Sequence, residues 1–249
     1  SAAWTVLHDL SMRRYEQLII GLDNLLFFFG EDGCDWRELT GQHTEHFLTW
    51  SRDGVNWSRP RERAPLIPTP HGTERFGRHT LGTPFMIVQD REIRIYHDIG
   101  RGHENHTYAT PRPKYITLAK LRRDGWAGFR AGAEEGWIET FPFTAPEHAL
   151  RVNADVSDGT LHVAVLSFRQ ENRYRRDFEI EPVPGFSRAE CRPITGDVYD
   201  AEIAWQEADW ADLAGERIVL RFSIQDGTLF SFWTRPHDSR QYVPLGRRR

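Results

Sequence analysis

Lysine and cysteine are scarce in this chain of 249 residues, and no long apolar run is present. The only lysines are Lys114 and Lys120, so almost all of the positive charge is arginine. The net charge of −4 argues against a nucleic-acid partner or an anionic membrane surface. No segment reaches the roughly eighteen apolar residues of a membrane-spanning helix, so we expect no membrane partner. Cys34 and Cys191 lie far apart, and we expect free thiols rather than a disulfide framework.

Helical patterns are almost absent as well. Only residues 208–214, "ADWADLA", could form a turn or two of helix. The rest of the chain consists of short runs rich in β-branched and aromatic residues, separated by Gly, Asp, Asn and Pro. With 39% hydrophobic and 12% aromatic residues there is enough apolar material for a sizeable core. The sequence therefore predicts an all-β protein.

Two stretches of the first half resemble each other. The run "LIIGLDNLLFFFG" (18–30) predicts two strands around a turn at Asp23 and Asn24, and "FMIVQDREIRIYH" (85–97) predicts two strands around Asp90 and Arg91. Each is followed by a polar loop, a third strand and an Arg-Asp-Gly turn, "SRDGVNW" or "RRDGWAGF". Asp-Gly favours a turn, because glycine tolerates positive φ and the Asp side chain bonds nearby backbone amides.

The spacing of these features indicates a repeat. Asp53 and Asp124 of the two Arg-Asp-Gly turns are 71 positions apart, and Asp23 and Asp90 are 67 apart. A four-stranded antiparallel unit repeated at this offset is typical of propeller blades. Two unrelated hairpins that share a common turn are the alternative. We predict a partial β-propeller of about two four-stranded blades in residues 1–140.

The period ends after Gly136. The runs "ALRVNADV", "GTLHVAVLS", "AECRPI", "DAEIAW", "RIVLRFSI" and "GTLFSFWT" alternate and are separated by turn residues. This pattern predicts an antiparallel β-sandwich in residues 141–236, followed by a tail, 237–249. Two blades leave bare sheet edges, so we expect preceding N-terminal blades or another protomer to complete the propeller.

Several segments match a known architecture. "SRDGVNWSRP", "YITLAKLRRDGWAGFRAG", "ALRVNADVSDGTLHVAVL", "GFSRAECRPITGD" and "LAGERIVLRFSIQDGTLFSFW" resemble the C-terminal half of bacterial glycosyl-hydrolase-like proteins. Those proteins resemble the clan of five-bladed β-propeller glycosidases, the invertase/levanase-like and arabinosidase-like families, in which a β-sandwich follows the propeller. The resemblance implies a carbohydrate or glycoside as the small-molecule partner. The Asp-Pro-Asn-like segment that carries the clan's nucleophile has no counterpart here.

The predicted catalytic residues are Glu16, Asp98 and His103. Glycoside hydrolysis needs two carboxyl groups across the scissile bond. The resemblance implies that Glu16 in "RYEQ" is the general acid and that His103, in a Gly-His pair, contributes as well. Asp98 ends a predicted strand and is the expected partner carboxylate. Asp53 and Asp124 belong to turns on the opposite face of a propeller, so we predict structural roles for them.

The face that carries the predicted catalytic residues is also expected to collect many polar side chains. Imidazole, guanidinium and aromatic side chains suit sugar recognition, and the expected binding residues are Arg14, Tyr15, Trp36, His43, His46, Arg78, His79, Arg101, Glu104 and His106. "HTEH" and "GHENH" also permit a divalent metal, since imidazoles and carboxylates are ordinary ligands. His-x-x-His on a strand is a weak signal, and we expect no metal and no other cofactor.

These observations favour a carbohydrate-active, glycosidase-like protein that processes a glycoside by carboxylate acid/base chemistry. The missing nucleophile segment keeps open a non-catalytic scaffold that binds carbohydrate or protein. A repurposed propeller enzyme of a biosynthetic pathway is the third possibility. No phosphate-binding glycine loop, nucleophile elbow or dinucleotide fingerprint is present.

Overall fold

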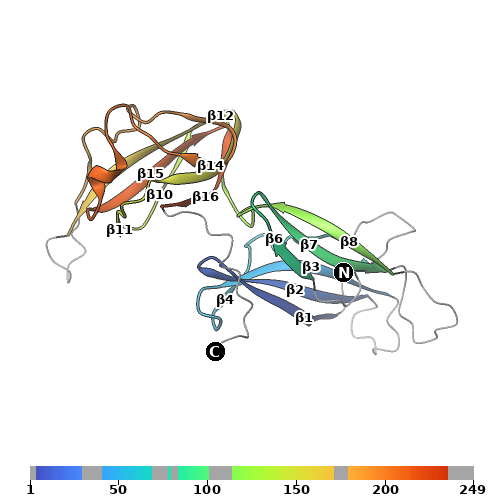
Figure 1. Cartoon of the computed structure of the whole chain (residues 1–249). Helices are drawn as coiled ribbons and strands as arrows, with labels where there is room; N and C mark the ends of the chain where they lie inside the picture. Colours follow the sequence, from blue (N-terminus) through green and yellow to red (C-terminus); the bar gives the residue numbers. More distant parts are fainter. Residues whose placement is uncertain are drawn as a thin grey trace. The chain divides into compact units, whose positions relative to one another are not determined.

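The computed structural model describes residues 4–29, 41–68, 78–79, 84–100, 114–170 and 179–234 (Figure 1). Within this part the protein is all-β, as predicted, with antiparallel strands and one short 3-10 helix. No helix in these ranges is long and apolar enough to cross a membrane. Contacts divide the chain into two compact units, Ser1–Arg122 with Asp238–Arg249, and Arg123–His237.

The first unit consists of two antiparallel sheets. One sheet has the order β1-β2-β3-β4, and in the other β7 pairs with β5 and β6 on one side and with β8 on the other. The strands are β1 (Trp4–Tyr15), β2 (Leu18–Phe29), β3 (Gly41–Ser51), β4 (Trp57–Ser58), β5 (Arg78–His79), β6 (Phe85–Val88), β7 (Glu92–Gly100) and β8 (Lys114–Arg122). Each sheet thus contains a meander of three longer strands, which explains the repeat in the sequence.

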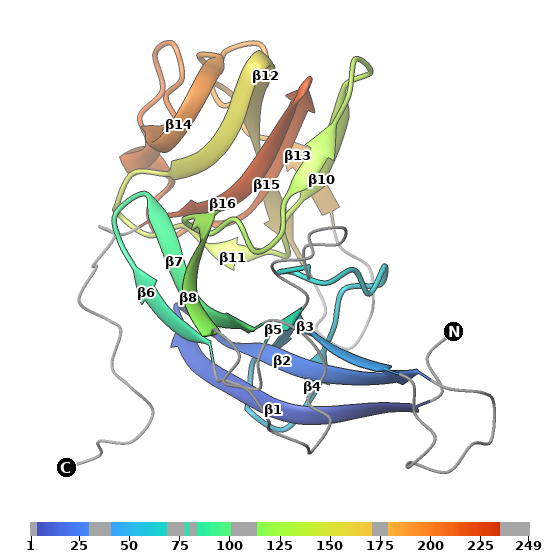
Figure 2. The same cartoon turned by 90° about the vertical axis from the view of Figure 1, so that its right-hand side faces the viewer.

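The two sheets pack face to face (Figure 2). Ser11 Oγ donates a hydrogen bond to the Pro84 carbonyl oxygen (2.9 Å), and the rings of His46 and His97 meet edge to face, 5.7 Å apart. Alternate residues of β2 and β7 supply the apolar part of this interface, including Ile20, Leu22, Ile93, Ile95 and Ile99. The core of the first unit therefore lies between the sheets.

The prediction of a turn at Asp23 and Asn24 is wrong. β2 runs through both residues as one strand, and the turn lies at Glu16 and Gln17 instead. Asp23 and Asn24 are turn formers because their side chains bond the local backbone. Here both side chains are buried in the sheet, and Asp23 is paired with Arg59, so tertiary contacts override the local preference. The second hairpin, between β6 and β7, is confirmed around Asp90 and Arg91.

The two Arg-Asp-Gly turns have different continuations. The first joins β3 to β4, as predicted. The second follows β8, and Asp124, at φ 59°, accepts a hydrogen bond from Ser231 Oγ (2.7 Å). The chain then enters β9 (Phe129–Ala131), which pairs with β16 (Gly227–Trp233) of the second unit. The expected fourth strand of a second blade is therefore not in the second sheet.

Asp53 organises the first of these turns. The Val55 and Asn56 amides donate to its Oδ1 (2.8 Å each), and Asn56 Nδ2 donates to its Oδ2 (2.7 Å). These bonds, with that from Ser51 Oγ, hold the pKa of Asp53 well below its ordinary value. A depressed carboxylate pKa contributes stability above its unfolded value, near 4, and that stability is lost as the pH falls through the folded value.

We expect Asp53→Asn to lower the stability of the first unit at neutral pH, because the amide cannot accept all these bonds. The difference from the parent should shrink as the pH falls below about 4, because the parent then loses the stability that its depressed carboxylate pKa contributes. Urea unfolding across this range measures it. Asp90→Asn, which changes an exposed carboxylate in the β6–β7 turn, is the control. A pH-independent difference would contradict the role given to the Asp53 carboxylate.

The second unit is built on one sheet of eight strands. Its main path has the order β10-β15-β12-β16-β9, with β11 also on β15, and β13 and β14 on β12. The further strands are β10 (Gly136–Glu139), β11 (Phe143–Thr144), β12 (Arg151–Arg169), β13 (Glu179–Pro182), β14 (Ile194–Glu202) and β15 (Arg217–Gln225). The expected helical turn is the 3-10 helix η2 (Trp210–Leu213), capped by the Asp209 side chain.

One long strand, β12, replaces two predicted ones. Its first part pairs with β14 and β16, and its second part pairs with β13 and β15. The apolar core includes Val152, Val163, Leu220 and Phe222, and Trp205 donates to the Val163 carbonyl oxygen (3.1 Å). Residues 123–139 belong to this unit, because β9 and β10 pair with β16 and β15. The sequence had placed the division at residue 140.

Candidate functional site

The predicted general acid and its partner carboxylate are not brought together. Glu16 is an exposed residue in the β1–β2 turn, at φ 50°. Asp98 follows His97, whose ring contacts the ring of His46 in the first sheet. Strand pairing aligns His46 with Asp9, so Asp98 lies at about the same height along the strands as Asp9. The stretch of β1 from Asp9 to Glu16 spans about 23 Å at roughly 3.3 Å per residue. Catalytic carboxyl pairs are about 5–9 Å apart, so this arrangement does not form one.

The orientation of Asp98 adds to the separation. His97 faces the first sheet, so Asp98, the next residue of β7, faces the other side of the second sheet. One of its carboxylate oxygens, Oδ1, is buried and accepts no hydrogen bond within the described ranges. Asp98 therefore points away from the space between the two sheets.

The other predicted binding residues do not form one pocket either. Arg14 is exposed near the end of β1, whereas Tyr15 is buried. His46 is fully buried between the sheets, where its ring packs on His97. His43 lies on β3, and Arg78 and His79 form β5, but their side chains are outside the description. Trp36, Arg101, His103, Glu104 and His106 lie outside the described residues altogether.

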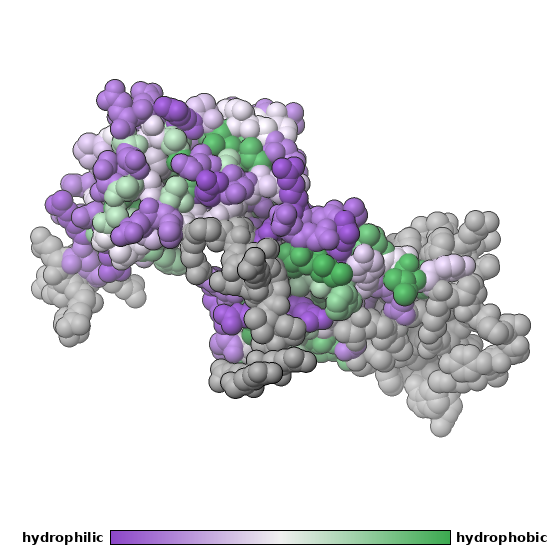
Figure 3. Space-filling model, viewed as in Figure 1, coloured by the Kyte–Doolittle hydropathy of each residue, from purple (hydrophilic) through white to green (hydrophobic). Residues whose placement is uncertain are grey.

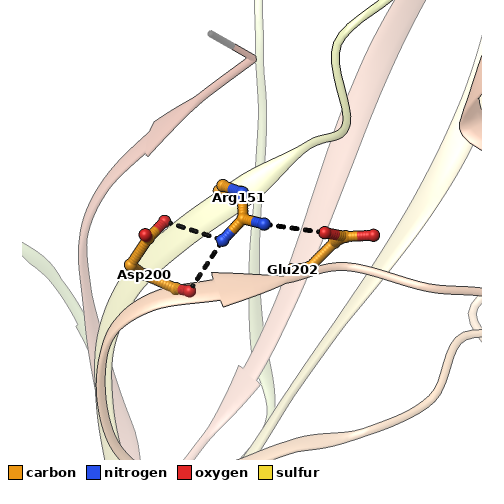
Figure 4. A network of polar contacts seen from close by, with 3 residues as sticks. All are labelled: Arg151, Asp200 and Glu202. Atoms are coloured by element: carbon orange, nitrogen blue, oxygen red, sulfur yellow. Dashed lines mark hydrogen bonds and ion pairs between the residues drawn. The ribbon is translucent and has the colours of Figure 1, made fainter. Parts of the chain in front are cut away.

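Metal binding finds no support in the described part of the chain. No group of three or more His, Cys, Asp or Glu side chains there is placed to hold an ion. The second unit has one conspicuous acidic pair, Asp200 and Glu202, but both carboxylates are bound to Arg151 (Figure 4). Arg151 donates to Asp200 Oδ1 and O (3.1 Å each) and to Glu202 Oε2 (2.8 Å). This network ties β12 to β14 and is structural.

A cavity lies against the outer face of the first sheet, on the side away from the second sheet. We call it the arginine cavity. Its volume is about 650 Å³, and its lining residues are Leu7, Leu10, Asp23, Thr49, Trp57, Arg59, Pro60, Arg61 and Arg63. The strands β1, β2 and β3 provide the floor, and the segment after the first Arg-Asp-Gly turn provides the wall.

Asp23 is the single carboxylate of this cavity. It is almost fully buried, and Arg59 donates a hydrogen bond to its Oδ2. Burial raises the pKa of Asp23, and the neighbouring Arg59 guanidinium opposes that rise. With Oδ2 taken by Arg59, Oδ1 is the remaining acceptor that a ligand hydroxyl could use. The cavity therefore has a fixed acceptor in its floor.

The wall is cationic. Arg61 and Arg63 are exposed, and neither side chain makes a hydrogen bond or ion pair within the part of the chain that the structure describes. Arg63 has a φ of 48°, in a turn closed by its own amide and the Pro60 carbonyl oxygen (3.2 Å). A positive φ is uncommon for residues other than glycine and carries strain. Three guanidinium groups thus border a cavity with one carboxylate.

Hydrogen bonds and close packing keep the aromatic part of the cavity in place. Trp57 Nε1 donates to the Gly54 carbonyl oxygen (3.2 Å), and Thr49 Oγ1 donates to the Ser58 carbonyl oxygen (2.8 Å). Gly21 lies beneath them. A Cβ at this position would meet Thr49 Cγ2 at 2.4 Å and Leu10 Cδ1 at 2.9 Å. The glycine therefore allows the side chains of the floor to approach β2 closely.

Sequence reasoning missed this site. It assigned Asp23 to a turn and placed the region of the Arg-Asp-Gly turn on the face away from the pocket. The available signal was "RPRER" (59–63), in which arginine alternates with other residues directly after a strand.

Comparison with protein-family models, with curated proteins and with solved structures gave no match.

Proposed function

We propose that the first unit binds a carbohydrate that carries a carboxylate, in the arginine cavity. The observation that carries the proposal is the excess of guanidinium groups, Arg59, Arg61 and Arg63, over the one carboxylate, Asp23. Guanidinium groups pair with carboxylates through two parallel hydrogen bonds, and Arg61 and Arg63 have no such partner among the described residues. A small acidic ligand supplies one.

The rest of the lining suits a sugar ring. Leu7, Leu10 and Trp57 offer apolar contact, and Asp23 Oδ1 can accept a hydrogen bond from a hydroxyl group. Apolar walls with a few placed polar groups are typical of small-molecule sites. Binding without hydrolysis is favoured over glycosidase chemistry, because Glu16 and Asp98 are far apart. The proposal thus corresponds to the scaffold alternative from the sequence.

Trigalacturonate and its methyl ester form a matched pair of probes, since esterification removes the charge and keeps the sugar. We expect the full chain to bind the acid, and the ester at least tenfold more weakly. Arg61→Gln and Arg63→Gln should each weaken binding of the acid roughly tenfold, because a hydrogen bond to a charged group is worth about 1.5–3 kcal/mol. Titration calorimetry at two salt concentrations measures this, and added salt should weaken binding.

Arg52→Gln is the control, since Arg52 is exposed in the Arg-Asp-Gly turn and outside the lining. It removes the same charge and should leave affinity unchanged. Equal binding of acid and ester, or equal losses in all three variants, would refute a specific acidic site.

The propeller and sandwich architecture also remains a proposal. The matched meanders support a blade repeat. The outer face of the second sheet carries exposed apolar residues against which a partner could pack: Phe85, Ile87, Ile116 and Leu118. Figure 3 shows hydrophobic surface in the part of the molecule where Figure 1 labels β6–β8. Both lysines of the chain lie on β8, and lysine on an edge strand hinders edge-to-edge pairing. A partner on the face is therefore favoured over one on this edge.

The way the two sheets pack favours a pair of sheets that is complete in itself, here called a closed pair, over two blades of an incomplete ring. Ile19 pairs with Ser51 and Glu92 with Arg122, just before the two Arg-Asp-Gly turns, so the registers correspond. When the two sheets are aligned on these pairs, Asn24 of the first sheet takes the position of His97 in the second, and His46 takes the position of Thr117. His46 and His97 both face the interface, so equivalent faces meet. In a propeller ring, each blade contacts the next through a different face from the one that contacts the blade before it. Two sheets that meet through the same face form a contact that is complete with two members. The oligomeric state in solution distinguishes a closed pair from an incomplete ring.

A further inference from the structure

The second unit has an exposed aromatic residue on a regular sheet face. Trp137 on β10 pairs with Ser223 on β15, and Ser223 pairs with His162 on β12. Paired residues of antiparallel strands point to the same face, so these three side chains form a row across the sheet, about 5 Å from one strand to the next. The opposite face packs on the core through Ile138, Phe222 and Val163.

The indole of Trp137 packs against a guanidinium group although it is 65% exposed. The Arg221 guanidinium lies over the ring, 5.1 Å from its centre. Glu139 Oε1 accepts hydrogen bonds from Arg221 Nε (2.8 Å) and Nη2 (2.6 Å), which fixes the guanidinium in turn. An exposed indole buries little apolar surface, so the stability of the unit does not explain its position. A fixed aromatic ring loses little conformational entropy on binding a ligand.

Polar groups lie beside this ring, and their charges balance. Glu135, just before β10, is paired with Arg188. Arg188 belongs to a segment that lies along β12 on the side away from β15. The two ion pairs, Glu135–Arg188 and Glu139–Arg221, leave no net charge on the surface. Burial, followed by the nearby Arg188, lowers the pKa of His162, so its ring is neutral at neutral pH. Its Nδ1 is buried and makes no hydrogen bond within the described ranges.

We propose that this surface, defined by Trp137, Glu139 and Arg221, binds a neutral pyranose ring. The apolar face of the sugar stacks on the exposed side of the Trp137 indole. Its hydroxyl groups donate hydrogen bonds to the Glu139 carboxylate, which lies on the same face as Trp137. An acidic ligand is disfavoured, because both arginines are already paired with glutamates. The site is separate from the arginine cavity and does not depend on it.

The test uses the full chain labelled with 5-fluorotryptophan, in which the signal of Trp137 is the one missing from Trp137→Phe. The probes are cellohexaose, xylohexaose and mannohexaose at millimolar concentration. We expect at least one of them to shift the Trp137 fluorine signal. By calorimetry, Trp137→Ala should bind that sugar roughly tenfold more weakly, and Trp137→Phe should lose less because it keeps an aromatic face.

Phe141→Ala is the matched control, since Phe141 is 93% exposed in the same unit and lies after β10. It should bind as the parent does. The proposal is overturned if no probe moves the Trp137 signal, or if Phe141→Ala loses as much affinity as Trp137→Ala. It is also overturned if the signal moves only with protein concentration, since the surface is then a protein interface. Loss of acid binding in Arg61→Gln leaves this result unaffected, so the two proposals fail independently.

Discussion

Gly159→Ala is expected to destabilise the second unit by roughly 3 kcal/mol or more, the upper range for overpacking a core. A Cβ at Gly159 would lie 1.9 Å from the Gln225 carbonyl oxygen, 2.7 Å from its carbon and 2.8 Å from the Asp226 oxygen. All three are backbone atoms, so no side-chain rotation relieves the contact. Asp226 is itself at φ 44°, in the connection between β15 and β16.

The position of Gly159 explains the size of the effect. Near this residue β12 changes partners, from β16 at Asp155 to β15 at Thr160, and it passes directly beside the β15–β16 connection. A displaced backbone here disturbs the pairing on both sides of the strand.

Thermal unfolding and amide hydrogen exchange of β12 and β15 measure the loss, and we expect the melting temperature to fall by roughly 10 °C or more. Gly132→Ala is the control, because a Cβ there meets no atom within 4 Å. A small change in Gly159→Ala, with protection retained, would show that the β15–β16 connection moves aside at little cost.

The same residue shows where sequence reasoning stopped. "SDGT" around Gly159 has the composition of a turn, and the sequence accordingly predicted two strands there. Local composition indicates that the backbone passes close to another segment here, but not whether the chain reverses its direction. The glycine is needed because backbone from residues 225 and 226 lies against it, and that contact joins segments far apart in the chain.

Predictions that depend on local chemistry were the reliable ones. The β6–β7 hairpin and the first Arg-Asp-Gly turn follow from turn residues between alternating strands, and both are present. Asp23 was misassigned because its carboxylate is paired with Arg59, which lies 36 residues further along the chain. The candidate site was missed for the same reason, since strand pairing brings Asp23 and the arginine segment together.

The Asp23–Arg59 pair provides the second large expected effect. We expect Arg59→Ala to lower the stability of the first unit by roughly 2 kcal/mol at neutral pH. Breaking a fully buried ion pair typically costs about 3–5 kcal/mol, and the exposure of Arg59 reduces this. The Arg59 side chain is 47% exposed, whereas that of Asp23 is 2% exposed. Removing the guanidinium leaves a carboxylate in the sheet without its cation.

The loss should depend on pH in a direction fixed by Asp23. Burial already raises the pKa of Asp23 in the folded protein, and without Arg59 the pKa rises further. A carboxyl group with a raised folded pKa costs no stability while it is protonated in both states. It lowers stability as the pH rises from its unfolded value, near 4, to its folded value. The difference between Arg59→Ala and the parent should therefore be small below about pH 4 and grow toward neutral pH.

Urea unfolding between these pH limits measures the difference, with Arg61→Ala as the control for a lost arginine that is not paired with Asp23. Adding Asp23→Asn to Arg59→Ala should recover part of the stability at neutral pH and remove the pH dependence, because a buried amide needs no cation. If the loss in Arg59→Ala were the same at all pH values, Arg59 would act by covering the sheet with its aliphatic stem. The carboxylate would then not be the group that makes the arginine necessary.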